Sequence, residues 1–101
     1  MKISGSVTVT TTDPTTIVVA TGEYIAFLKR LKITNLAASA NTVSVIYFNG
    51  DIPKIVMVSV VGVNEEKVYD EKSLPIEAAP TAIAVRGTAQ PYVVDFSVEL
   101  L

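Results

Sequence analysis

The chain has 101 residues, with eight basic and ten acidic side chains, a net charge of −2, and no Cys, His or Trp. Disulfides, thiolate metal sites and nucleophiles that need a histidine base are therefore excluded. The balanced charge argues against a phosphate-binding surface, so nucleic acid is not an expected partner. Half of the residues are apolar and the mean hydropathy is +0.47, which indicates more apolar surface than one small core can use.

The sequence gives no sign of a membrane partner. Its apolar runs stay below the roughly 18 residues that cross a bilayer. The first residues, MKISGSVTVTTTDP, lack the apolar block and the cleavage site of a signal peptide. We therefore expect assembly in the cytoplasm.

The N-terminal part predicts two strands. Ser4–Thr12 alternates Val with Ser and Thr, which is typical of an edge strand, and residues 1–14 could alternatively form an extended arm that ends at the Asp13-Pro14 turn. Thr16–Thr21 is a short strand, and Gly22-Glu23 is expected to be the turn after it.

The longest predicted strand is Tyr24–Leu36. Strict alternation would point Lys29 inward, and a buried lysine without a partner is costly. A bulge at Lys29-Arg30 solves this problem, because Leu28 and Leu31 then both face inward. A helix is the weaker alternative, since the stretch contains β-branched residues and a strongly alternating segment follows it.

We expect this bent strand to be shared between two sheets. In this hypothesis Ala37–Asn41 is a hairpin loop, and Leu31–Asn35 pairs with Thr42–Tyr47. Thr42–Asn49 places valines on one face, whereas its other face begins polar and ends apolar at Ile46 and Phe48.

The next strand, Lys54–Val63, is apolar on both faces. The turn signal Asn49-Gly50-Asp51 precedes it, and Ile52-Pro53 suggests a connection longer than a two-residue hairpin. A strand in a small antiparallel sandwich normally has one face in water, so two apolar faces indicate cover by another subunit. The candidate interface residues are Val56, Val58, Val60, Ile46, Phe48, Val7 and Val9.

The C-terminal part predicts further short strands. Asn64–Lys72 is a charged loop or short strand that protects an edge, and Pro75 favours an edge position for Ser73–Ala78. Thr81–Gly87 is short, whereas Tyr92–Leu101 alternates cleanly and should line the core. About eight strands and no helix predict an all-β, single-domain antiparallel sandwich over residues 1–101, with jelly-roll or related Greek-key topology.

Charged residues suggest no catalytic, cofactor or metal site. Asp51, Asp70, Asp95 and Glu99 are the possible members of a carboxylate pair, but Asp95 and Glu99 lie about 13 Å apart along one strand, too far for glycosidase chemistry. The acids of residues 65–71 match no calcium loop and are interpreted as solvated. The cations of residues 29–32 are interpreted as a solvent-exposed group.

Aromatic residues leave a carbohydrate-binding module open as an alternative function. Such a module needs exposed rings, whereas core packing also explains most of the aromatic positions. The residues in question are Tyr24, Tyr47, Phe48, Tyr69 and Tyr92.

Several short motifs resemble small β-sandwich virion proteins of tailed bacteriophages and related viruses. These motifs are Gly22-Glu23, LKITN at 31–35, ASAN at 38–41, TVSV at 42–45, and Leu74-Pro75-Ile76. The resemblance covers about residues 16–100. It implies a non-enzymatic capsid decoration (cement) protein, or a tail or head-fibre component, that needs no cofactor. It also implies a homo-oligomer, with a trimer favoured, that binds the major capsid protein in the virion.

Overall fold

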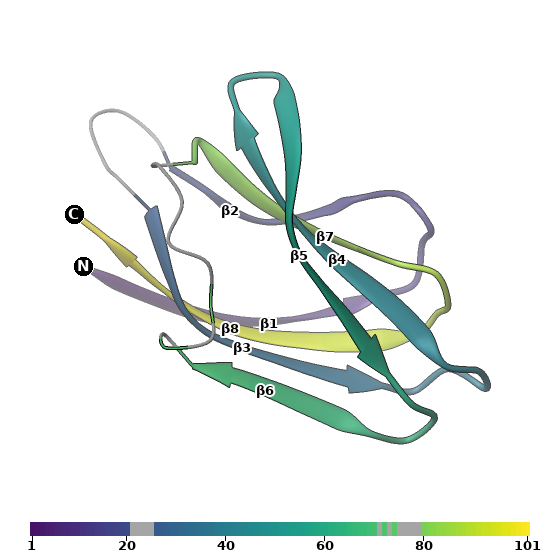
Figure 1. Ribbon diagram of the computed structural model, residues 1–101. Coiled ribbons are helices and arrows are strands. Elements are labelled where there is room, and N and C mark those ends of the chain that lie inside the picture. Colours follow the sequence, from purple (N-terminus) through teal and green to yellow (C-terminus); the bar gives the residue numbers. More distant parts are fainter. Residues whose placement is uncertain (21–25, 71, 73, 75–79) are drawn as a thin grey trace.

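The structure is a computed structural model that describes residues 1–20, 26–70, 72, 74 and 80–101. These residues form eight strands and no helix, in two four-stranded antiparallel sheets ordered β1-β8-β3-β6 and β2-β7-β4-β5 (Figure 1). The predicted all-β sandwich is therefore confirmed. The strands are β1 (Lys2–Val9), β2 (Thr15–Val19), β3 (Ala26–Asn35), β4 (Asn41–Asn49), β5 (Ile52–Val61), β6 (Glu66–Asp70), β7 (Ala82–Gly87) and β8 (Tyr92–Leu100).

The strand order is that of a jelly roll. β1 pairs with β8, β2 with β7, β3 with β6 and β4 with β5, as in one long antiparallel ribbon folded over on itself. The β3–β8 and β4–β7 pairs then join the folded ribbon into two sheets. Of residues 1–14, which could be an extended arm or an edge strand, Lys2–Val9 form β1, an edge strand beside β8.

The bulge predicted in the long strand is confirmed. The register of β3 against β8 shifts between Leu28 and Arg30, which leaves Lys29 as the extra residue. Leu28 and Leu31 are consequently both buried, while Arg30 is exposed. Residues 21–25, including the expected Gly22-Glu23 turn, lie outside the described residues, as does most of the expected strand at 73–78.

The expected pairing of Leu31–Asn35 with Thr42–Tyr47 is wrong. β3 lies between β8 and β6 in one sheet, whereas β4 lies between β7 and β5 in the other. Residues 36–40 therefore cross from one sheet to the other and do not form a hairpin loop.

Two buried asparagines hold this crossover. The Asn35 side-chain amide donates to the carbonyls of Ser39, Val61 and Gly62 at 2.9, 3.2 and 3.1 Å, and its oxygen accepts from the Ala37 N–H at 3.0 Å. The Asn41 amide donates to the Ala89 carbonyl at 2.8 Å, and its oxygen accepts from the backbone N–H groups of residues 88 and 89. These side chains replace the backbone pairing that the crossover lacks.

The β4–β5 connection is shorter than expected. Asn49 pairs with Ile52, so the loop consists of Gly50 and Asp51, and Gly50 has a positive φ of 62°. Pro53 is already part of β5, which tolerates a proline because β5 is an edge strand.

The core lies between the sheets and is mostly aliphatic. Its fully buried members include Leu31, Ile33 and the Tyr92 ring, and the face of β8 that was expected to line the core does so. The Tyr92 hydroxyl is buried and makes no hydrogen bond with any described residue. Burial raises the pKa of Tyr92 from 10.0, and the nearby Gly87 backbone partly offsets this rise. Within the described ranges, no helix is long and apolar enough to cross a membrane.

Candidate protein-binding face

The outward surface of the β2-β7-β4-β5 sheet, here called the apolar face, is built from rows of side chains that run across the strands. The registers place Val19, Ala82, Phe48 and Pro53 side by side in one row. The next rows hold Thr16, Ala84, Ile46 and Ile55, then Arg86, Ser44 and Val58, and finally Thr42 and Val60. Apolar side chains thus continue across four strands.

The rim of the apolar face is exposed although its centre is covered. Val19, Ile55, Val58 and Val60 keep 56–59% of their surface accessible, whereas Ile46 at the centre is buried by its neighbours. Monomeric soluble proteins rarely leave such a contiguous apolar surface in water, and those that do commonly bind through it.

The apolar face contains an open groove of about 620 Å³. Apolar side chains of β4 and β5 make most of its wall, and Arg86 of β7 is the charged residue among its lining, beside Ser44. The lining residues are Pro14, Ser44, Ile46, Phe48, Pro53, Ile55 and Arg86. The groove suits an apolar side chain with a nearby acceptor or acid for Arg86.

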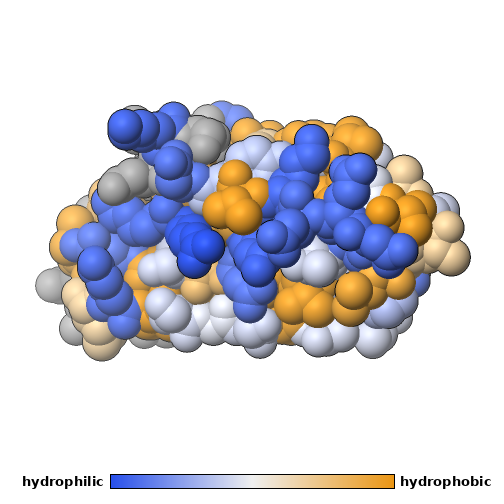
Figure 2. Space-filling model, turned by 90° about the horizontal axis from the view of Figure 1, so that it is seen from below, coloured by the Kyte–Doolittle hydropathy of each residue, from blue (hydrophilic) through white to orange (hydrophobic). Residues whose placement is uncertain are grey.

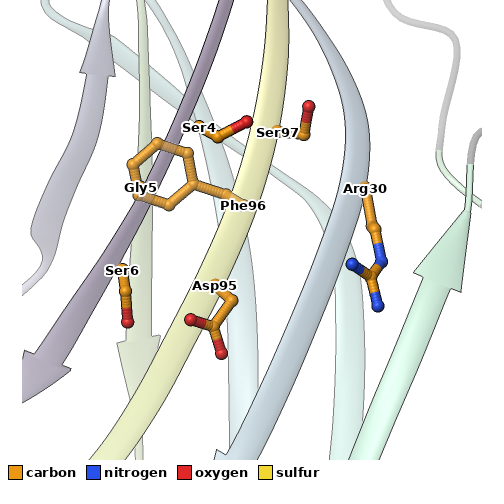
Figure 3. A pocket seen from close by; sticks show the side chains of 7 residues that line it. All are labelled: Ser4, Gly5, Ser6, Arg30, Asp95, Phe96 and Ser97. Atoms are coloured by element: carbon orange, nitrogen blue, oxygen red, sulfur yellow. The ribbon is translucent and has the colours of Figure 1, made fainter.

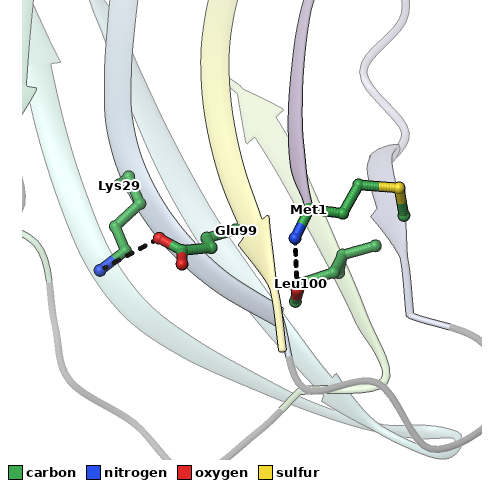
Figure 4. A network of polar contacts seen from close by, with 4 residues as sticks. All are labelled: Met1, Lys29, Glu99 and Leu100. Atoms are coloured by element: carbon green, nitrogen blue, oxygen red, sulfur yellow. Dashed lines mark hydrogen bonds and ion pairs between the residues drawn. The ribbon is translucent and has the colours of Figure 1, made fainter.

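The opposite outward surface, that of the β1-β8-β3-β6 sheet, is here called the polar face. Figure 2 shows hydrophilic side chains crossing it, with separate apolar patches between them. Ion pairs link its strands: Lys32 lies 3.2 Å from Glu66, and Lys29 lies 3.9 Å from Glu99 (Figure 4). Beside the second pair, the Met1 amine donates to the Leu100 carbonyl at 3.0 Å. The expected solvent exposure of the cations at 29–32 fits this surface, where Arg30 is exposed and Lys29 and Lys32 are partly exposed.

A second pocket, of about 440 Å³, lies over β1, β8 and β3 (Figure 3). Its lining is mainly hydroxyl and charged side chains, from Ser4, Ser6, Arg30, Asp95 and Ser97, with Gly5 and Phe96 completing it. The Phe96 ring crosses β1 at Gly5, where a Cβ would lie 2.7 Å from the ring. Glycine at this position thus lets an aromatic ring lie over the neighbouring strand.

The structure sorts the predicted interface residues into two groups. Val58 and Val60 are exposed on the apolar face, and Ile46 and Phe48 line its groove. The other three residues point inward. Val9 is 1% exposed and is a core residue, so it cannot serve as a surface contact, and Val7 and Val56 are partly buried against the core.

The inward position of Val56 has a local cause. The register of β5 against β4 shifts between the pairs Val45–Met57 and Ile46–Ile55, so Val56 is an extra residue. This bulge reverses the alternation of β5, and Ile55 takes the outward position that strict alternation assigns to Val56.

Most aromatic residues considered for a carbohydrate platform are not available as exposed rings. Tyr47 and Tyr92 are buried in the core, and Tyr24 lies outside the described residues. Tyr69 is partly buried, and its hydroxyl lies 2.5 Å from that of Ser59, joining the two sheets between β6 and β5. Phe48 remains as a partly exposed ring in the groove.

The carboxylates considered for chemistry are dispersed. Asp51 lies in the β4–β5 turn, Asp70 at the end of β6, and Asp95 and Glu99 on β8. Among the residues that the structure describes, no three acidic side chains gather in a way that could hold a metal ion.

No protein-family model and no curated protein matches this sequence. Among solved structures, the crystal structure of PirA is similar to it, with a TM-score of 0.64 and 13% sequence identity. The match covers 93% of this chain and 92% of that chain. At this identity the likeness shows a shared fold alone.

Proposed function

We propose that this chain is a non-catalytic structural subunit of a larger protein assembly and that it binds its partner through the apolar face. The observation that carries the proposal is the set of exposed aliphatic side chains at the rim of the apolar face, beside an apolar groove and opposite a sheet whose outward surface is polar. Burying apolar surface contributes roughly 25 cal/mol per Å², so a partner that covers this face gains stability without any strongly polar contact.

The resemblance to small bacteriophage virion proteins supports a virus particle as the assembly. In this proposal the chain is a capsid decoration subunit that binds the major capsid protein and its own copies, with a tail or head-fibre component as the alternative position. The high mean hydropathy and the unprotected apolar face both suit a protein that is permanently covered after assembly.

A pair of matched substitutions tests the binding face. Val19→Asp places a charge on the apolar face, while Val68→Asp introduces the same charge on the polar face, where Val68 is 52% exposed. Capsids purified without this protein should retain the wild type and Val68→Asp on a density gradient, and should lose Val19→Asp.

The virion assignment has its own readout. Particles purified from a culture that carries the gene should contain the chain in an immunoblot. Its absence from purified particles would reject the virion role, whereas equal retention of the two variants would reject the apolar face as the contact.

A further inference from the structure

The outer edge of β5 forms one border of the apolar face. β5 is the last strand of its sheet and, among the described residues, pairs with β4 alone. The backbone groups along its other side can accept a further strand. Its ten residues make it twice as long as either β2 or β6, which are also edge strands.

The other edge strands carry features that discourage strand addition. β1 alternates its apolar residues with Lys, Ser and Thr, β2 contains a register shift between Thr16 and Val18, and β6 reads Glu-Lys-Val-Tyr-Asp. Only the first half of β5 carries features that discourage strand addition, namely Pro53, Lys54 and the bulge at Val56. The second half, Met57 to Val61, has no charge, proline or bulge.

We propose that β5 pairs with β5 of a second copy in antiparallel orientation. The two four-stranded sheets then become one eight-stranded sheet, with a two-fold axis near Ser59. In this register Val58 of one copy lies opposite Val60 of the other on the outward side. Such cross-strand pairs of β-branched residues stabilise antiparallel strands, and here they cover valines that are 56% and 59% exposed.

The charges at the two ends of β5 are complementary in this arrangement. Lys54 lies five residues before Ser59, and Asn64 lies five residues after it, next to Glu65. The Glu65 carboxylate folds back over Gly62, where its oxygens lie 2.9 Å from the position of a Cβ, so it stays beside the end of β5. Antiparallel pairing brings Lys54 of each copy to the Glu65 end of the other, whereas parallel pairing would place like charges together.

The symmetry of the contact sets the size of the product. A two-fold contact uses the β5 edge of both copies and leaves no β5 edge for a third, so the product is a closed dimer. The resemblance to virion proteins implies a trimer instead. The mass of the particle in solution distinguishes the dimer from the trimer.

Charge substitutions at Val58 test the pairing. In sedimentation, wild type should be a dimer, while Val58→Lys and Val58→Glu should each be monomeric. Each substitution replaces the valine that lies opposite Val60 with a charge, and it places two like charges diagonally across the axis. An equimolar mixture of the two variants should recover the dimer. A wild type that sediments as a trimer or a monomer would overturn the proposal. So would a mixture of the two variants that stays monomeric although both variants keep the wild-type circular dichroism spectrum.

Cysteine cross-linking reads the register, because the natural sequence contains no cysteine. Opposed residues in antiparallel strands have Cα atoms about 4.5–5.5 Å apart, within the range that a disulfide spans. A mixture of Val58→Cys and Val60→Cys proteins should oxidise to dimers faster than Val68→Cys on the polar face. Equal rates would contradict a contact through β5.

The dimer and the proposed function can fail separately. Val19→Asp lies on β2, at the other edge of the sheet, and should leave the dimer intact while it abolishes capsid binding. If Val19→Asp loses capsid binding and the wild type is not a dimer, the proposed function stands and the pairing of β5 is rejected.

Discussion

Replacing Asn35 with Ala tests whether the buried amide network holds the crossover between the two sheets. Asn35 is fully buried, and the alanine variant would leave the Val61 carbonyl and the Ala37 N–H buried without their partner. Each orphaned buried group costs about 1–3 kcal/mol. The partly buried carbonyls of Ser39 and Gly62 can turn to water and add roughly 1 kcal/mol in total.

The expected loss in the free energy of unfolding is therefore about 3–7 kcal/mol, a large share of the roughly 5–15 kcal/mol that stabilises a typical domain. Urea unfolding followed by circular dichroism measures it. With an m-value of about 1–3 kcal/mol/M, the midpoint should fall by at least about 1 M.

The matched control is Asn49→Ala, since Asn49 is exposed at the end of β4. This change should alter stability by no more than about 0.5 kcal/mol. A loss below about 1 kcal/mol for Asn35→Ala, or equal losses for the two variants, would refute the reasoning.

Three further predictions concern the core. Ile33→Ala should lower the free energy of unfolding by about 2–5 kcal/mol. Phe96→Ala should lower it less, because Phe96 is only partly buried. If urea unfolding shows the larger loss for Phe96→Ala, the burial argument is contradicted. Gly5→Ala should be destabilising because its Cβ would lie 2.7 Å from the Phe96 ring. In a chain that already carries Phe96→Ala, the same substitution should cause no further loss of stability. Additive losses in the double variant would argue against the clash. Because the pKa of Tyr92 is raised above 10.0 in the folded state, the unfolded chain loses this proton first, and stability should fall as the pH rises beyond 10.0. Tyr92→Phe should flatten this fall in thermal unfolding. At neutral pH it should change the free energy of unfolding little, since the geometry gives the buried hydroxyl no hydrogen bond with the described residues; an unchanged pH profile would count against the prediction.

Local sequence features predicted the faces of the strands well. The cost of burying Lys29 identified the β3 bulge, since a strand with uninterrupted alternation cannot turn both Leu28 and Leu31 inward. The same alternation assigned Val58 and Val60 to an exposed face, because a strand that is apolar on both sides has more apolar surface than the core can cover. Alternation wrongly assigned Val56 to the outward face. A strand that is apolar on both faces has no polar residue that would show where a bulge shifts the alternation.

The neighbours of β3 were not predictable from alternation, which sets the face of a residue and not the partner of a strand. The link at residues 36–40 has the length of a hairpin loop, and yet it crosses between sheets. The signal that could have identified it is a pair of asparagines at inward positions. Asn35 continues the face of Leu31 and Ile33, and Asn41 continues that of Val43. A polar side chain at the buried end of two successive strands indicates a connection that needs side-chain hydrogen bonds.

The pairing of the first strand with the last determines the order in which the chain can fold. β4 and β5 adjoin a two-residue loop and can pair as soon as both are synthesised. β1 must wait for β8, since Lys2 lies opposite Glu99, and β3 needs the same strand on its other side. Until β8 leaves the ribosome, the β1-β8-β3-β6 sheet lacks one of its two central strands, and β1 and β3 have open edges. Contacts this distant in sequence slow folding, so this sandwich remains vulnerable to aggregation until β8 has been synthesised.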